Sequence, residues 1–224
     1  MEAAGRKMHK IRIIGIGPGH PDYLLPAAAR AMAKVSILVG SPRALEEYAK
    51  DCQQTFPITG DIGAVLFFIH EALEKGEVGV LVSGDPGYYS LLDALRREFS
   101  PEILEVIPGL SAMQLAFARL ALPWHGSGLL SFHGRRPEPE ELCYKPGRIL
   151  GMLTDNNWNS RSIAELLIEK GWPEDSRLAI CLRLSYADEE IIDTTLGKAR
   201  AGEEKARGIL IVQGKEHLDG LFRH

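Results

Sequence analysis

The chain has 224 residues, of which 45% are hydrophobic and 25% are charged, and its formal net charge is -4. This composition predicts a globular protein with one large or two small domains and excludes disordered and collagen-like chains. Because the 26 Lys and Arg residues are interleaved with 30 Asp and Glu residues, duplex DNA or RNA is not expected as the main partner.

The cysteines and the N-terminal region indicate in which compartment the protein is expected. Cys52, Cys143 and Cys181 are far apart and form no CxxC pair, so we expect neither a disulfide framework nor a metal site. The apolar run at residues 11–16 is too short for the core of a signal peptide and leads into a glycine turn. We therefore expect a cytoplasmic protein that does not associate with a membrane.

Short β-branched runs alternate with amphipathic stretches of helical length in the first half of the chain. Strands are predicted at Lys10–Ile16, Val35–Gly40, Val78–Ser83 and Glu102–Ile107. Helices are predicted at Tyr23–Lys34, Ile62–Lys75, Tyr88–Phe99 and Ser111–Leu120. This alternation is typical of a parallel α/β sheet.

The segment that follows is rich in residues that break regular structure, Pro123, Gly126 and Gly128. We place a linker there, at 122–127, between an N-terminal α/β domain at 1–121 and a C-terminal α/β domain at 128–224. In the second domain, strands are predicted at Leu129–His133, Arg148–Thr154, Leu178–Leu184, Glu190–Leu196 and Gly208–Gln213, and a helix near Ser162–Lys170. A hairpin around Ala187–Asp188 predicts that this domain has a mixed sheet.

The turn at residues 15–19, GIGPG, invites comparison with the GxGxxG turn that cradles a dinucleotide. The third glycine would fall at His20, and Pro18 has no backbone N–H. The next strand also ends at Gly40 and Ser41, without an acid to hold a ribose. A dinucleotide site is therefore not supported, and a tight turn that needs glycine conformations remains the simpler interpretation.

A second turn, SGDPG at residues 83–87, follows the third predicted strand. Asp85 before Pro86 is typical of a helix N-cap with proline at the first helical position. The functional alternative is that the Asp85 carboxylate and the backbone around it meet a ligand at the carboxyl end of the strand, where open α/β sheets bind.

A third turn, PGLSAMQ at residues 108–114, again lies between a strand and a helix. Ser111 and Gln114 match a capping box, which explains both residues without a ligand. Three glycine-bearing turns at strand ends are nevertheless expected to line one rim of the sheet, where small residues let a ligand approach the backbone. Together they predict a binding pocket.

The second domain offers two segments at strand ends that are suited to chemistry, SFHGRR at residues 131–136 and Leu153-Thr154-Asp155. Arg135 and Arg136 suit carboxylates, because guanidinium groups bind them through two parallel hydrogen bonds. His133 is a candidate for proton handling. The alternative is a solvated loop with a histidine that is packed or exposed.

Taken in order, GIGPGHP, SGDPGYYSL, IPGLSAMQLAFARLALPW, SFHGR, LTD and LSYADEE resemble the tetrapyrrole methylase family over nearly the whole chain. Four segments are most similar to the cobalamin-pathway members that methylate carbon 5 of cobalt-precorrin-7: residues 26–30 (PAAAR), 40–43 (GSPR), the long AFARLALPW segment and SFHGR. A fused version acts on precorrin-6Y at carbons 5 and 15. We expect the carbon 5 activity alone, with a separate carbon-15 methylase and decarboxylase as a functional partner.

The resemblance implies a class III S-adenosylmethionine methyltransferase fold of two α/β domains, with the cofactor in the cleft between them, and a homodimer. By similarity, the cofactor-binding positions are Pro18, Ser83, Gly84, Asp85, Tyr88, Ser111, Ala112, Leu153 and Leu184. Arg43, Arg135 and Arg136 are the candidates for the peripheral carboxylates of the tetrapyrrole substrate, and His133 is the candidate catalytic residue.

Three positions depart from the family pattern: His20, Ser90 and the stretch Asn156-Asn157-Trp158. They affect the expected placement of the ring more than the cofactor site. The alternatives to carbon 5 methylation are a family member that acts on another ring carbon, a modifier of RNA or protein with the same fold, and a nucleotide-binding regulatory subunit without turnover.

Overall fold

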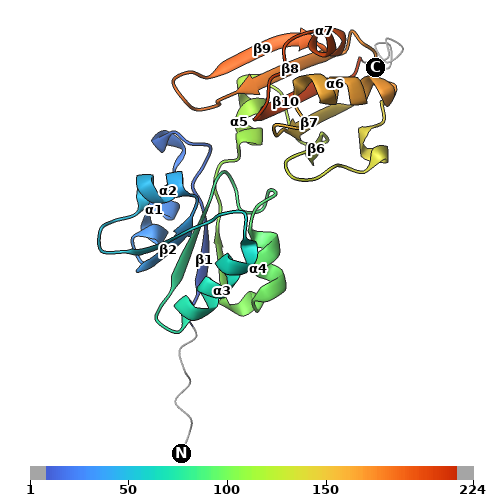
Figure 1. The fold of residues 1–224 in the computed structure, drawn as a ribbon. Helices are drawn as coiled ribbons and strands as arrows, with labels where there is room; N and C mark the ends of the chain where they lie inside the picture. Colours follow the sequence, from blue (N-terminus) through green and yellow to red (C-terminus); the bar gives the residue numbers. More distant parts are fainter. Residues whose placement is uncertain (1–8, 216–224) are drawn as a thin grey trace, which may run out of the picture. The chain divides into compact units, whose positions relative to one another are not determined.

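The computed structural model describes residues 9–215, which form two compact units that divide between Ser111 and Ala112. The first unit contains a five-stranded sheet with the order β3-β2-β4-β1-β5, and the second a five-stranded sheet with the order β6-β7-β10-β8-β9 (Figure 1). The α/β fold class, with one parallel and one mixed sheet, is confirmed.

All neighbouring strands of the first sheet are parallel. Its strands are β1 (Ile11–Gly15), β2 (Ile37–Gly40), β3 (Gln54–Pro57), β4 (Val78–Val82) and β5 (Leu104–Ile107). Its helices are α1 (Pro26–Met32), α2 (Pro42–Tyr48), α3 (Ile62–Leu73) and α4 (Leu92–Glu98), with short 3₁₀ turns η1 (Pro21–Tyr23) and η2 (Pro101–Ile103).

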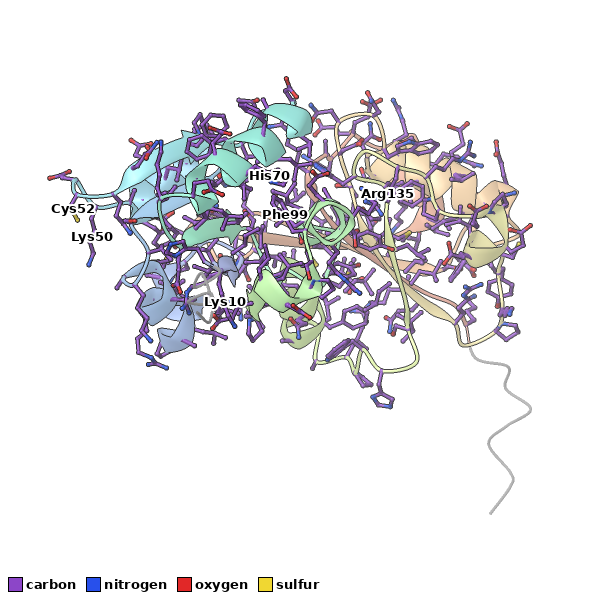
Figure 2. The ribbon with its side chains drawn as sticks, turned by 90° about the horizontal axis from the view of Figure 1, so that it is seen from below. Lys10, Lys50, Cys52, His70, Phe99 and Arg135 are labelled. Carbon is purple, nitrogen blue, oxygen red and sulfur yellow. The ribbon has the colours of Figure 1, made fainter. Side chains whose placement is uncertain are left out.

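The central strands are apolar on both faces, because helices cover both. Along β1, Ile13 packs in a cluster with residues of α3 and α4, whereas Ile14 packs in a cluster with residues of α1 and α2. Figure 1 shows these two helix pairs on opposite sides of the sheet. At the end of α4 the ring of Phe99 lies 4.4 Å from that of His70 on α3 (Figure 2). Because successive side chains of a strand point to opposite faces, one sheet contributes to two hydrophobic clusters, one on each face.

In the second unit, β6 (Gly128–Ser131) is parallel to β7 (Ile149–Leu153), and β10 (Gly208–Gln213) is antiparallel to both β7 and β8 (Arg177–Leu182). β8 and β9 (Glu190–Thr195) are antiparallel neighbours, which confirms the expected hairpin. The helices are α5 (Ala112–Arg119), α6 (Ser160–Glu169) and α7 (Leu196–Ala201), and η3 (Pro139–Leu142) is a 3₁₀ turn.

Helices also cover both faces of the second sheet. Met152 belongs to a cluster with residues of α6 and α7, while its neighbour Gly151 faces α5. A Cβ at Gly151 would lie 2.6 Å from the sulfur of Met113 and 2.9 Å from the ring of Phe117. Gly151 therefore lets α5 pack closely on β7. Helix α5 belongs to this unit, which begins at Ala112. The linker expected at 122–127, and the domain bounds on either side of it, stay predictions.

Within residues 9–215, none of the helices combines the length and the apolar character that crossing a membrane requires.

The three thiols should differ sharply in reactivity. Cys52 and Cys143 are exposed, whereas Cys181 is buried on β8. Burial, and secondarily the charge of Glu189, raises the pKa of the Cys181 thiol to about 12. Because the thiolate is the nucleophile, Cys181 should stay unmodified in native protein from pH 7 to pH 9, while both other thiols are alkylated. Mass spectrometry of native protein treated with iodoacetamide checks this, and labelling of Cys181 at the rate of Cys52 would contradict it.

Candidate functional site

Three of the loops of the first unit come together at one edge of its sheet. β4, β1 and β5 are adjacent and parallel, so the loops that follow them begin at the same edge. The first two loops are joined directly: Gly84 donates from its backbone N–H to the Gly17 carbonyl (2.8 Å), and Gly17 donates to the Gly84 carbonyl (3.3 Å). The predicted alignment of the three glycine turns on one rim is therefore confirmed.

The Asp85 carboxylate joins the second loop to the third. Its Oδ2 accepts from the backbone N–H of Gly109 (3.0 Å) and its Oδ1 from the N–H of Gly87 (2.8 Å). A carboxylate has about four acceptor positions, so two remain for other donors. Asp85 thus both holds the loops together and keeps acceptor capacity at the carboxyl edge of the sheet.

The glycines allow close approach between the loops themselves. A Cβ at Gly109 would lie 2.2 Å from the Gly84 carbonyl oxygen, and a Cβ at Gly15 would lie 2.7 Å from the Gly109 nitrogen. Gly17 and Gly84 also have φ values of +75° and +73°, which glycine adopts without strain. These glycines are thus required for the loops to pack against one another. The sequence alone suggests only that small residues would let a ligand approach the backbone.

The expectation that Asp85 caps a helix is wrong. The residues after Asp85 form turns, and α4 begins only at Leu92. Its start depends on Ser90, whose hydroxyl donates to the Pro86 carbonyl (2.5 Å) and accepts from the N–H of Leu92 (3.1 Å). The departure at Ser90 therefore has a structural explanation. So does His20, whose Nδ1 accepts from the Asp22 N–H (3.2 Å) and caps η1.

The other cofactor candidates of this unit lie in the same loops. Ser83 is exposed, Pro18 and Tyr88 are half-buried, and Ser111 is buried immediately before α5. The Tyr88 ring packs edge-on against Tyr89, with centroids 4.8 Å apart. Burial, and then the charge of Tyr89, raises the pKa of the Tyr88 phenol, which therefore stays protonated at neutral pH. The edge thus presents a hydroxyl, an aromatic surface and a carboxylate.

These groups fit S-adenosylmethionine. Its amino and hydroxyl groups are donors that the remaining acceptor positions of Asp85 and the Ser83 hydroxyl can satisfy, and its adenine suits an aromatic or apolar surface such as Tyr88. Ala112, the first residue of α5, adds a small side chain after Ser111. The residues present are consistent with the predicted cofactor, and their individual roles stay predictions.

The substrate candidates lie at the carboxyl ends of strands. Arg43 is exposed on α2, directly after β2, with its Nη1 3.7 Å from Glu47 Oε2. His133, Arg135 and Arg136 are exposed in the loop after β6, where Figure 2 labels Arg135. Exposure leaves these side chains accessible to a ligand without establishing that they bind one.

The two leucines expected to contact the cofactor through their backbone lie at the same edge of the second sheet. Leu153 ends β7, and its carbonyl accepts from the Phe132 N–H (2.9 Å). Leu184 is buried after β8, between Arg183 and Ser185, which have φ values of 47° and 75°. Left-handed residues other than glycine are costly, and such strain is concentrated at functional sites.

Two residues at this edge were given no role from the sequence: Asp155, which was named only as part of a strand-end segment, and Arg207. Asp155 accepts backbone hydrogen bonds from two loops, and Arg207 donates from Nε to Asn156 Oδ1 (2.9 Å). The LTD motif contains Asp155, so the acid after a strand was a usable signal. Arg207 has no such signal, because only the antiparallel placement of β10 brings it to this edge.

The chain belongs to the tetrapyrrole (corrin/porphyrin) methylase family, whose model matches residues 10–200. It is 34% identical over 161 residues to the cobalt-precorrin-7 C(5)-methyltransferase of Salmonella typhimurium, which covers 72% of this chain and 79% of that protein. It is 28% identical over 211 residues to the probable cobalt-precorrin-7 C(5)-methyltransferase of Methanocaldococcus jannaschii, which covers 93% of this chain and 100% of that protein. The resemblance that the motifs carry is confirmed.

A solved structure supports the same fold. The crystal structure of the cobalamin biosynthesis precorrin-6Y methylase CbiE from Archaeoglobus fulgidus matches with a TM-score of 0.71 and 23% identity. The match covers 93% of this chain and 100% of that one.

Proposed function

We propose that this protein transfers a methyl group from S-adenosylmethionine to carbon 5 of cobalt-precorrin-7 in cobalamin biosynthesis. The observation that carries the proposal is the 34% identity to a relative named for this reaction. The loops clamped by Asp85 support it independently, since they gather acceptors suited to the cofactor at one edge of a parallel sheet.

S-adenosylmethionine supplies a methyl group already activated on a sulfonium, so the protein need not provide a nucleophile. The chain's own contribution is then to bind both reactants and align them, which can lower a barrier by up to about 7–11 kcal/mol in favourable cases. In this proposal the cofactor is held by Asp85 with Ser83 and Tyr88. Arg43 and Arg135 bind the ring carboxylates.

Three further parts of the proposal rest on the sequence: that the protein is cytoplasmic, that it forms a homodimer, and that a separate enzyme methylates and decarboxylates at carbon 15. His133 is proposed to handle a proton at the ring. Its exposed imidazole lies close in sequence to Arg135 and Arg136, and its backbone N–H donates to Ser131 Oγ (3.2 Å).

Incubation with S-adenosylmethionine and cobalt-precorrin-7 tests the function. Mass spectrometry should show that the ring gains one methyl group as S-adenosylhomocysteine appears. Binding of the cofactor without methylation of this ring would favour another family member or a regulatory subunit.

Arg135→Ala should weaken binding of the ring substrate and leave binding of the cofactor unchanged. Loss of one charge-assisted interaction with a carboxylate is expected to raise the KM for the ring about tenfold, which is about 1.4 kcal/mol. The Kd for S-adenosylmethionine, measured by calorimetry, should not change. An unchanged KM would show that the loop after β6 is only a solvated connection.

A further inference from the structure

The carboxyl edge of the second sheet gathers segments that are far apart in the sequence. β6 and β7 are parallel and both end there. β10 is antiparallel to β7, so β10 begins at this edge, and the residues that precede it lie beside the loop after β7. The Thr154 hydroxyl joins the two: it donates to the Gly208 carbonyl (3.0 Å) and accepts from the Gly208 N–H (2.7 Å).

Asp155 gives the loop after β7 a fixed shape. Its Oδ1 accepts from the backbone N–H groups of Asn157 and Trp158 (both 2.8 Å), and its Oδ2 accepts from the N–H of Gly134 in the loop after β6 (3.1 Å). The hydrogen bonds from Trp158 and then Gly134 hold the pKa of the Asp155 carboxyl below its ordinary value. The carboxylate therefore ties two loops together whenever it is ionised.

This loop holds two arginines through neutral groups. The Arg136 guanidinium lies over the ring of Trp158, 5.2 Å from its centroid, and that ring is backed by Phe132 at 5.2 Å. Arg207 donates from Nε to Asn156 Oδ1 (2.9 Å). Its backbone has a φ of 56°, a conformation that is unfavourable for any residue with a Cβ. Arg207 thus has a strained backbone, and its side chain contacts the stretch that departs from the family pattern.

Five other arginines of this unit have acidic partners. They are paired as Arg119–Glu189, Arg161–Glu204, Arg177–Asp193, Arg183–Asp188 and Arg200–Glu174. Among residues 9–215, by contrast, neither Arg136 nor Arg207 forms an ion pair with a carboxylate. Both are exposed. Two guanidinium groups that contact one hydrogen-bonded loop, and that have no carboxylate partner, are arranged to receive an anion from outside the chain.

We propose that Arg207 and Arg136 bind peripheral carboxylates of the ring substrate, and that Asn156 and Asp155 position the two guanidinium groups. The inference rests on the proposed function, because a tetrapyrrole precursor is the source of the carboxylates. Arg207 uses Nε for Asn156, so its terminal nitrogens remain for the ligand. Arg207 is therefore assigned as a specificity-determining residue for the ring, and Asn156 as a positioning residue.

Arg207→Asn tests the assignment, since asparagine tolerates the left-handed backbone that this position requires. The KM for cobalt-precorrin-7 is expected to rise about tenfold, with kcat and the Kd for S-adenosylmethionine unchanged. The KM should also become less sensitive to ionic strength, because one charge–charge interaction is lost. Arg207→Lys should restore only part of the affinity, because an ammonium cannot bind a carboxylate through two parallel hydrogen bonds.

Asn156→Ala separates positioning from a structural role. Alone it should raise the KM severalfold, and combined with Arg207→Asn it should add nothing, because Asn156 acts through Arg207. Arg177→Gln is the matched control: it removes an arginine paired with Asp193, at the opposite edge of the same sheet, and should leave the KM unchanged.

The wild-type reaction distinguishes the two proposals. If wild-type protein fails to methylate the ring, the proposed function fails. If it methylates the ring and folded Arg207→Asn has the wild-type KM and salt dependence, the assignment of Arg207 is overturned. Additive effects of the Asn156 and Arg207 substitutions would overturn the positioning role alone.

Discussion

Replacement of Asp85 by alanine is expected to abolish S-adenosylmethionine binding, with the Kd raised at least about a hundredfold, while the protein stays folded. The substitution removes the acceptor that joins Gly109 to the second loop and leaves two backbone N–H groups without their partner. Loss of such a partner typically costs about 1–3 kcal/mol of stability. The larger effect should be on the affinity for the cofactor, because its binding site loses both a carboxylate and the arrangement of the loops.

Calorimetric titration with S-adenosylmethionine measures the effect, and thermal unfolding reports the loss of stability. Asp61→Ala is the matched control, because the Asp61 carboxylate also accepts a backbone hydrogen bond, from Ala64 at the start of α3 (3.0 Å). That variant should lose comparable stability and keep its affinity. Undiminished cofactor binding by Asp85→Ala would exclude the edge loops of the first unit as the cofactor site.

Gly109→Ala should be nearly as severe, for a steric reason. The added methyl group would meet the Gly84 carbonyl oxygen at 2.2 Å and the Gly15 Cα at 3.0 Å, and both are backbone atoms that cannot rotate away. The loops must separate, at a cost of about 1–3 kcal/mol. We expect the affinity for S-adenosylmethionine to fall at least about tenfold, because the hydrogen bond from Gly109 to Asp85 is disturbed as well.

Gly60→Ala provides the comparison, since a Cβ at Gly60 would meet no heavy atom within 4 Å and its φ lies outside the left-handed region. Calorimetry and thermal unfolding of both variants should show a loss only at Gly109. Equal behaviour of the two variants would mean that close packing of the loops is not required for binding.

Much of the fold could be predicted from periodicity. Nine of the ten strands described within residues 9–215, all except β3, and the long helices fall near their expected positions, because each buries an apolar face of sufficient length. Short elements were missed: α2 and α7 have too few residues for a clear period, and β3 has four residues and ends in Pro57. The helix expected from Tyr88 begins later, at Leu92, since Tyr89 adopts a φ of 50° in the turn.

The sequence predicted where the loops of the site lie, but not which hydrogen bonds their side chains form. Glycine turns after parallel strands identify an edge from sequence alone. That Asp85 would bond to Gly109 rather than cap a helix depends on β5 lying beside β1, which no local pattern reveals. The same holds for Arg207, which reaches Asn156 only because β10 runs antiparallel to β7.

The position of the transferred methyl group is the most direct test of methylation at carbon 5. Cobalt-precorrin-7 is incubated with the protein and S-adenosylmethionine that carries an isotopically labelled methyl group, and the product is examined by NMR. We expect a single labelled methyl group at carbon 5 of the ring. A label at any other ring carbon, or a ring left unlabelled by protein that binds the cofactor, would contradict it.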